Sequence, residues 1–195
     1  MSRFKGDDAG RFIIAAVAFR LRDGPPTVTY PDLVAHMQQH AIMSPAVGDV
    51  REAVLAVRRR KAMVIDSGDP DTRSVGSFFM NPVMDAAVYA SIVAPGGGPV
   101  PSFPAAGGQV KVPAAWLIER AGFTRGFAAG AAGLSSRHPL AIVNRGGASA
   151  RDVVALASRI KRQVADRFGI WLRTEPVFVG FGEDADVRFL QKAQG

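Results

Sequence analysis

The sequence predicts an α+β fold, in which helices and short strands are mixed without regular alternation. Residues 149–168 carry the apolar repeat of an amphipathic helix, whereas residues 11–21 and 140–143 are apolar runs typical of strands. Stretches rich in Gly and Pro separate these segments, and the chain contains 21 glycines and 13 prolines in 195 residues. This pattern indicates a globular protein with one large or two small domains.

Composition excludes several classes of function. The chain has no cysteine, so disulfides and thiolate chemistry are excluded. Its three histidines are scattered at positions 36, 40 and 138, and without clustered carboxylates they predict no metal site. No apolar run approaches the roughly eighteen residues of a membrane span. The charged N-terminus lacks a signal-peptide pattern, so we expect a cytoplasmic protein without a membrane partner.

The first half of the chain begins with a predicted strand. Residues 11–21 are almost continuously apolar, which predicts a strand covered on both faces and therefore in need of neighbours. Asp32 is expected to cap a helix that runs to about His40. Asp49 starts a second helix, whose apolar face consists of Val50, Ala53, Val54 and Val57.

A basic run ends this second helix. Residues 58–61 read Arg-Arg-Arg-Lys, and the whole chain has a net charge of +7. Such a charge favours anionic partners, which include nucleic acid, phosphate-bearing metabolites and acidic lipid. The same residues also suit a solvated helix end, where they complement the helix dipole. Because no nucleic-acid-binding module or aromatic platform accompanies the run, we expect no nucleic-acid partner.

The second half of the chain contains the clearest helix signals. Residues 85–94 form a short apolar helix, and Pro113 begins another that Gly122 ends. Ser149 and Asp152 resemble a capping box at the start of the long helix that Gly169 ends. Residues 170–181 then predict a final strand interrupted by Pro176, and the polar tail from Glu183 is expected to be frayed.

One stretch combines several chemical groups. Residues 76–82 read GSFFMNP and place a hydroxyl, two aromatic rings and an amide within seven residues. The glycine and the proline at its ends favour a rigid turn. Taken by residue type alone, the stretch is a buried turn with two core phenylalanines.

This stretch and others resemble the MurB family of UDP-N-acetylenolpyruvoylglucosamine reductases, also called UDP-N-acetylmuramate dehydrogenases. GSFFMNP is similar to the family signature G-S-F-F-x-N-P. Upstream of it, TYPDL at 29–33 is similar to a family motif, and downstream the similar segments are VKVPAAWLIE at 110–119, VNRGGA at 143–148 and LRTEP at 172–176.

The resemblance implies the C-terminal half of that fold: a substrate-binding domain with the remnant of the second FAD-binding domain. It places the end of the FAD-binding domain at residues 1–62, the substrate-binding domain at 63–172, and a returning strand and tail at 173–195. The chain starts at the third position of the family motif Y-R-x-S-x-F-K, so the preceding arginine and the Gly-rich flavin segment are expected to be absent. The family uses FAD and NADPH, and this chain alone is expected to be inactive.

The family reduces the enol ether of UDP-N-acetylglucosamine enolpyruvate during peptidoglycan precursor synthesis. The resemblance implies that Ser77 donates the proton and that Glu175 supports this step. A serine hydroxyl is an unusual acid, and it needs a strongly basic carbanion or donors that stabilise the alkoxide. Without the resemblance, Ser77 remains a turn residue and Glu175 a carboxylate at a strand edge.

Further residues are implied in substrate binding. Lys61 resembles the family's charge-neutralising lysine, and Tyr30 resembles the tyrosine that folds over the nucleotide-sugar. Asn81, Lys111 and His138 are additional candidates for substrate contact. Helix-end charge and a strand-edge aromatic remain the structural alternatives for Lys61 and Tyr30. The alternative function is a non-enzymatic UDP-sugar-binding module derived from the same fold.

Overall fold

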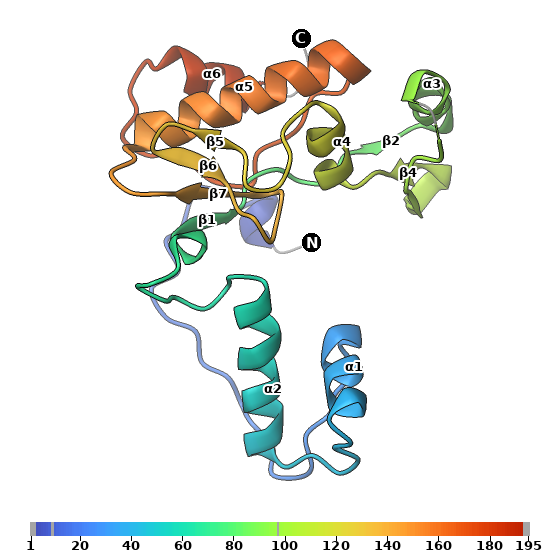
Figure 1. The fold of residues 1–195 in the computed structure, drawn as a ribbon, viewed down its shortest axis with the longest axis vertical. Helices are drawn as coiled ribbons and strands as arrows, with labels where there is room; N and C mark the ends of the chain where they lie inside the picture. Colours follow the sequence, from blue (N-terminus) through green and yellow to red (C-terminus); the bar gives the residue numbers. More distant parts are fainter. Residues whose placement is uncertain (1–2, 9, 97, 193–195) are drawn as a thin grey trace. The chain divides into compact units, whose positions relative to one another are not determined.

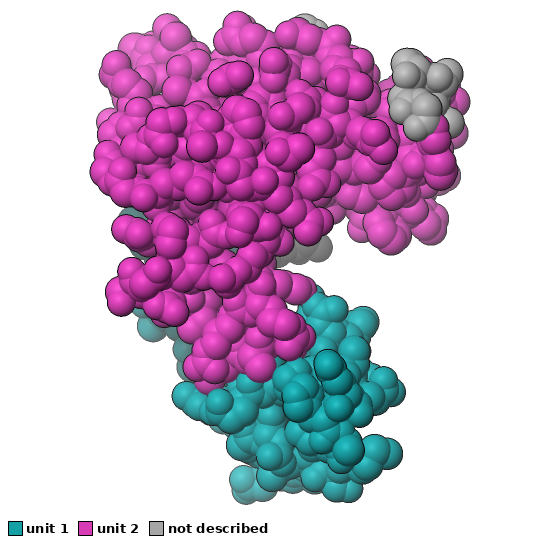
Figure 2. All heavy atoms as spheres, in the orientation of Figure 1, with its two compact units in different colours: residues 1–53 teal, residues 54–195 magenta. Residues whose placement is uncertain are grey.

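The computed structural model describes residues 3–8, 10–96 and 98–192 (Figure 1). The chain divides into two compact units, Met1–Ala53 and Val54–Gly195 (Figure 2). The described helices are α1 (Pro31–Gln39), α2 (Val47–Arg60), α3 (Ala86–Gly96), α4 (Ala114–Arg120), α5 (Ala150–Phe168) and α6 (Ala185–Gln191), with 3₁₀ turns η1 (Arg3–Lys5), η2 (Pro70–Thr72) and η3 (Ala106–Gly108). The strands are β1 (Ser74–Ser77), β2 (Val83–Met84), β3 (Phe103–Pro104), β4 (Val110–Lys111), β5 (Ala128–Ala129), β6 (Ala132–Leu134) and β7 (Ala141–Asn144).

The second unit is built on two small antiparallel sheets. One is four-stranded in the order β1-β7-β6-β5, and the other is three-stranded in the order β2-β4-β3. Helix α5 packs against β6 and β7, and α4 and α6 in turn contact α5 (Figure 1). The α+β class predicted from the sequence is therefore confirmed.

Helix α5 forms where the sequence predicts it. The Ser149 hydroxyl accepts a hydrogen bond from the Asp152 backbone N–H, and the Asp152 carboxylate accepts one from the Ser149 N–H, so the capping box is complete. Gly169 ends the helix in the left-handed conformation, with φ of 68°. The buried side chains of α5 include Leu156, Ile160 and Val164, which belong to the predicted apolar stripe.

Residues 76–84 connect the two sheets. Phe78 and Phe79 are each only 2% exposed and belong to the main hydrophobic core, which confirms their predicted packing role. Gly76 has a φ of +75°, which an L side chain rarely adopts. The segment then enters β2, so the residues that follow Ser77 are held from both ends.

The C-terminal tail is not frayed up to residue 192, which corrects the prediction. The Asp184 carboxylate accepts hydrogen bonds from the N–H groups of Asp186 and Val187 and thereby caps α6. From α5, Lys161 inserts a fully buried ammonium group that donates to the carbonyl oxygens of Phe189, Leu190 and Lys192 at 3.1, 2.8 and 2.5 Å. Desolvation lowers the pKa of Lys161 to about 8. The polar composition of the tail indicated neither the cap at Asp184 nor the hydrogen bonds from Lys161.

The predicted strand at residues 170–181 is also corrected. In the structure this stretch makes a single bridge, between Thr174 and Phe79. Two backbone hydrogen bonds flank it, from Met80 N–H to the Arg173 oxygen and from Glu175 N–H to the Phe78 oxygen, both 2.9 Å. Pro176 has no N–H to donate, so the pairing does not continue beyond Glu175.

In the first unit, α1 confirms the predicted helix but not its cap. Tyr30 occupies the N-cap position without a side-chain cap, and Asp32 lies in the first turn. The prediction for residues 11–21 was wrong, because they form no strand and their apolar side chains are exposed, Ile13 by 96%. A strand needs a partner for its backbone groups, and none pairs with this segment in the described part of the chain.

Candidate functional site

Ser77 and Glu175 lie on neighbouring segments of the second unit. Ser77 is the last residue of β1, is half-buried, and pairs with Ala141 of β7. The carbonyl of the next residue, Phe78, accepts the hydrogen bond from the backbone N–H of Glu175 at 2.9 Å. The side chain of Glu175 is exposed. The buried Phe78 therefore joins the segment that carries Ser77 to the segment that carries Glu175.

His138 lies on the other side of β1. Its ring Nδ1 accepts a hydrogen bond from the Leu140 N–H at 3.1 Å, and the Leu140 carbonyl accepts one from the Phe78 N–H at 2.9 Å. The pKa of His138 is lowered, first by burial and then by the positive charges of Lys61 and Arg125. The pKa of the imidazole thus shifts toward the neutral form under burial and the field of two cations.

Lys61 is fixed by the way α2 ends. The Met63 N–H donates to the Arg58 oxygen at 2.8 Å and the Ala62 N–H to the Arg59 oxygen at 3.0 Å, which is the Schellman pattern. Ala62 takes the left-handed position, with φ of 55°. Lys61 is the C-cap residue between these bonds, so its backbone has little freedom even though it follows a helix end.

Asn81 lies in the segment that connects the two sheets, and Lys111 lies in β4 of the three-stranded sheet. The Asn81 side-chain oxygen accepts a hydrogen bond from the Ala114 N–H at 2.8 Å, at the start of α4. Lys111 pairs with Val83 in the sheet, and its amine lies 5.7 Å from the centroid of the Phe103 ring. Asn81 therefore joins the segment 76–82 to the start of α4, and Lys111 pairs with the strand that follows this segment.

Tyr30 belongs to the first unit, where 56% of it is exposed. Its backbone carbonyl accepts hydrogen bonds from the N–H groups of Leu33 and Val34 at the start of α1. Backbone hydrogen bonds thus place Ser77, Glu175 and His138 on segments that meet at Phe78, and the charge of Lys61 acts on His138, whereas Tyr30 is described with the first unit.

Two residues near the site were missed by the sequence analysis. Arg125 forms an ion pair with Glu119 at 3.3 Å and acts on the pKa of His138. Arg137 donates to the Arg59 carbonyl at 2.9 Å and forms an ion pair with Asp69 at 2.7 Å. Neither lies in a motif with a fixed spacing. The excess of positive charge was the one signal in the sequence, and it did not indicate positions.

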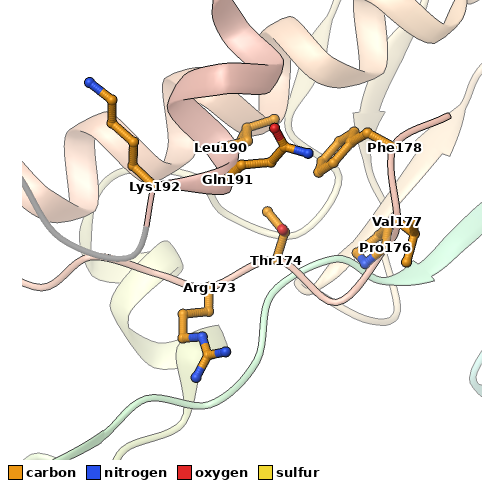
Figure 3. Close-up of a pocket in the computed structure, with 8 residues that line it drawn as sticks. All are labelled: Arg173, Thr174, Pro176, Val177, Phe178, Leu190, Gln191 and Lys192. Atoms are coloured by element: carbon orange, nitrogen blue, oxygen red, sulfur yellow. The ribbon is translucent and has the colours of Figure 1, made fainter. Parts of the chain in front are cut away.

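A cavity of about 280 Å³ lies between residues 173–178 and the end of α6 (Figure 3). Thr174, Phe178 and Gln191 are among its lining residues, and none of the seven predicted site residues is. In Figure 3, the side chains of Arg173 and Lys192 extend away from each other, so they do not converge on one bound group. Glu175 lies between two lining residues, Thr174 and Pro176, but is not itself among the residues that line the cavity.

The described residues contain no cluster of three or more His, Cys, Asp or Glu side chains placed to hold a metal ion. Among the same residues, no helix has the length and apolar character needed to cross a bilayer. The groups that the site offers are a hydroxyl, a carboxylate, a neutral imidazole and several cations. This set suits proton transfer beside an anionic substrate.

Comparison with known proteins gives consistent matches. Residues 69–179 match the family model described as "UDP-N-acetylenolpyruvoylglucosamine reductase, C-terminal domain". Curated proteins named UDP-N-acetylenolpyruvoylglucosamine reductase are similar over most of the chain. The one from Thermobifida fusca (strain YX) is 44% identical over 187 residues, which cover 92% of this chain and 52% of that relative.

Mycobacterial relatives with the same name are somewhat more similar over shorter stretches. The protein from Mycobacterium leprae (strain Br4923) is 50% identical over 77% of this chain and 41% of its own length. The one from Mycobacterium tuberculosis (strain ATCC 25618 / H37Rv) is 54% identical over 67% of this chain and 37% of its own length. The chain thus spans about half, or less, of the length of these curated relatives.

Proposed function

We propose, from the premise that this chain belongs to the UDP-N-acetylenolpyruvoylglucosamine reductase family, that it supplies the substrate-binding and proton-donating part of a UDP-N-acetylmuramate dehydrogenase. The substrate would be UDP-N-acetylglucosamine enolpyruvate, and the reaction a step of peptidoglycan precursor synthesis, which serves cell wall growth, cell shape and division. A cytoplasmic location accords with a nucleotide-linked substrate. Residues 1–62, 63–172 and 173–195 are proposed as FAD-domain remnant, substrate-binding domain and returning segment.

The hydrogen bond between the Phe78 carbonyl and the Glu175 N–H carries this proposal. Reduction of an enol ether adds hydride to one carbon and a proton to its neighbour. We propose that Ser77 delivers the proton and that Glu175 supports it from the adjoining segment. Two polar groups on adjoining segments that a backbone hydrogen bond joins suit the requirement that catalytic groups be positioned before reaction.

The substrate's diphosphate would bind at the cationic side of β1. Lys61 and Arg125 both act on His138, so their positive charges already converge there in the absence of ligand. A bound diphosphate would reverse this field and raise the pKa of His138. Tyr30 would cover the nucleotide-sugar, while Lys111 and the side-chain nitrogen of Asn81 would contact it from the three-stranded sheet.

FAD and NADPH are the proposed sources of reducing equivalents, since they supply hydride in flavin reductases. The described residues of the first unit do not fit a closed flavin site, because the apolar segment 11–21 is exposed and unpaired there. The proposal for this chain therefore covers substrate binding and protonation only.

Calorimetry with UDP-N-acetylglucosamine enolpyruvate tests the substrate-binding part. We expect the 195-residue chain to bind it, and Lys61→Ala to weaken binding about tenfold or more, as for loss of a charged contact. Ser77→Ala should retain binding, because it removes a proton donor and no charge. Arg151→Ala, on an exposed helix start, is the matched charge control and should bind normally. Absence of binding by the unchanged chain would refute the proposal.

Activity tests separate the reductase from the alternative, a non-enzymatic UDP-sugar-binding module. The exposed segment 11–21, which forms no strand, favours the module. Alone, the chain should neither retain yellow flavin nor oxidise NADPH. We then add a polypeptide that carries the N-terminal half of the Thermobifida fusca relative. The reductase reading predicts substrate-dependent NADPH oxidation that Ser77→Ala abolishes. Binding without any such oxidation in the mixture would support the module instead.

A further inference from the structure

We propose that Arg137 is a positioning residue that holds the end of α2, which carries Lys61, against the loop before β7, which carries His138. The effect of Arg137 on substrate binding rests on the proposed function. The contacts that Arg137 makes do not depend on that function. They come from the described residues of the second unit alone.

The first contact is at the end of α2. The Arg137 guanidinium donates from Nη1 to the Arg59 carbonyl oxygen at 2.9 Å. The same oxygen accepts the Ala62 N–H that closes the helix. Arg137 therefore binds the peptide groups that determine where Lys61, two residues after Arg59, is placed.

The second contact joins Arg137 to the turn before β1. Its Nη2 lies 2.7 Å from Asp69 Oδ2, and Asp69 Oδ1 accepts the Asp71 N–H at 3.0 Å. A guanidinium presents several donors in a fixed plane, so it can reach both partners at once with one side-chain conformation. Lysine has a single charged centre and cannot reproduce this geometry.

The third contact fixes the loop that carries Arg137. Asp71, which is 7% exposed, accepts hydrogen bonds from the Ser135 hydroxyl at 3.1 Å and from the Ser136 N–H and hydroxyl at 2.8 and 2.6 Å. Burial alone would raise the pKa of Asp71, but these bonds and the charge of Arg145 lower it. An ionised, buried carboxylate with several donors makes the loop rigid.

The consequence is a fixed distance between the two sides of the site. His138 follows Arg137 directly, and Lys61 follows the carbonyl that Arg137 binds. Without Arg137, the end of α2 and the loop before β7 lose the guanidinium that joins them. The charge of Lys61 would then act less on His138. Arg137 would then matter for substrate affinity without touching the substrate.

Titration of the His138 ring, followed by NMR, tests this without any ligand. Lys61→Gln should raise the pKa of His138, because it removes one of the cations beside it. In an Arg137→Gln background the same change should raise it by less than half as much. His138→Gln assigns the signal among the three histidines. An equal rise in both backgrounds would overturn the proposal.

Two further variants keep the test decisive if Arg137→Gln does not fold. Arg137→Lys retains the charge but not the two-armed geometry, and Asp69→Asn removes only the ion pair while keeping an acceptor for Asp71. Both should reduce the effect of Lys61→Gln on His138. If neither variant reduces it, Arg137 does not position Lys61.

Calorimetry with UDP-N-acetylglucosamine as the probe connects the inference to function. Arg137→Gln should weaken binding about tenfold, and adding Lys61→Gln should weaken it little further, because both changes remove the same contact. Fully additive losses would show that Arg137 acts elsewhere. If the unchanged chain fails to bind, the proposed function fails, whereas the His138 titration still decides the role of Arg137.

Discussion

The two units of this chain differ in how they bury apolar side chains. The main core consists of residues from Phe78 to Leu190, all in the second unit. In residues 3–8 and 10–53, the buried apolar side chains are Met37 and Ala53. The apolar residues that the first unit exposes include Phe12, Ile13, Ile14, Val17, Phe19 and Leu21. Apolar content therefore stabilises a fold only where a second surface covers it.

The largest expected difference concerns the same substitution in both units. Leu117 is fully buried in α4, whereas Leu21 is 87% exposed. Leu117→Ala should lower the free energy of unfolding by about 2–5 kcal/mol, because it leaves a cavity in the core. Leu21→Ala should change it by less than about 0.5 kcal/mol. Urea unfolding followed by circular dichroism measures both, and similar losses would contradict the contrast between the units.

The buried amine of Lys161 gives the second unit a stability that depends on pH. Its pKa is about 8 in the folded chain, against 10.5 for an ordinary lysine. Between these pH values the unfolded state binds more protons, so stability rises with pH, and the cost of burying the charge is full below pH 8.

We therefore compare unfolding of the unchanged chain and of Lys161→Met at pH 7 and pH 10. The unchanged chain should gain on the order of 1–3 kcal/mol relative to the variant at the higher pH, from a shift of this size. Parallel behaviour of the two proteins would show that the amine is not desolvated.

Each unit also contains one helix that ends on a left-handed alanine. Ala62 has φ of 55° after α2, and Ala41 has φ of 54° after α1, with the Ile42 N–H donating to the Met37 oxygen at 2.9 Å. Glycine takes this conformation without the steric cost of a Cβ atom. Ala62→Gly should raise the free energy of unfolding of the second unit by about 0.5–1 kcal/mol. Ala41→Gly should leave that transition unchanged, and an equal effect would mean that the units unfold together.

The smallest effect is expected on the exposed segment itself. Ile13→Lys should change the free energy of unfolding by less than about 0.5 kcal/mol, because the side chain contacts little. It should nevertheless reduce the NADPH oxidation restored by an added N-terminal half, if residues 11–21 pair with that half. Unchanged restoration with Ile13→Lys would show that the segment is not the contact.

Local signals in the sequence predicted the helices well. The capping box at Ser149 and the glycine at 169 mark the two ends of α5, because each acts on backbone groups within a few residues of itself. The two errors at strands, residues 11–21 and 170–181, have the same origin. Apolar character predicts burial or pairing, but pairing depends on a distant segment that the local sequence does not specify.

The candidate site was predictable only to the extent that its residues lie in recognisable motifs. Ser77 was identified from the stretch around it, and its predicted role stays untested. Arg137 was not identified from the sequence, because its contacts are with the Arg59 carbonyl and with Asp69, which are distant in sequence. A backbone acceptor has no residue type, so no pattern of side chains could have indicated that contact.

The buried amine of Lys161 also makes α6 an internal reporter of local opening. An amine-reactive label cannot reach a side chain with no exposed surface while α6 remains docked on α5. The rate at which Lys161 alone is modified would therefore measure how often the last helix detaches. Mass spectrometry of labelled peptides would read this directly, and it would reveal whether the C-terminal segment next to Glu175 opens as a separate unit or only when the whole core unfolds.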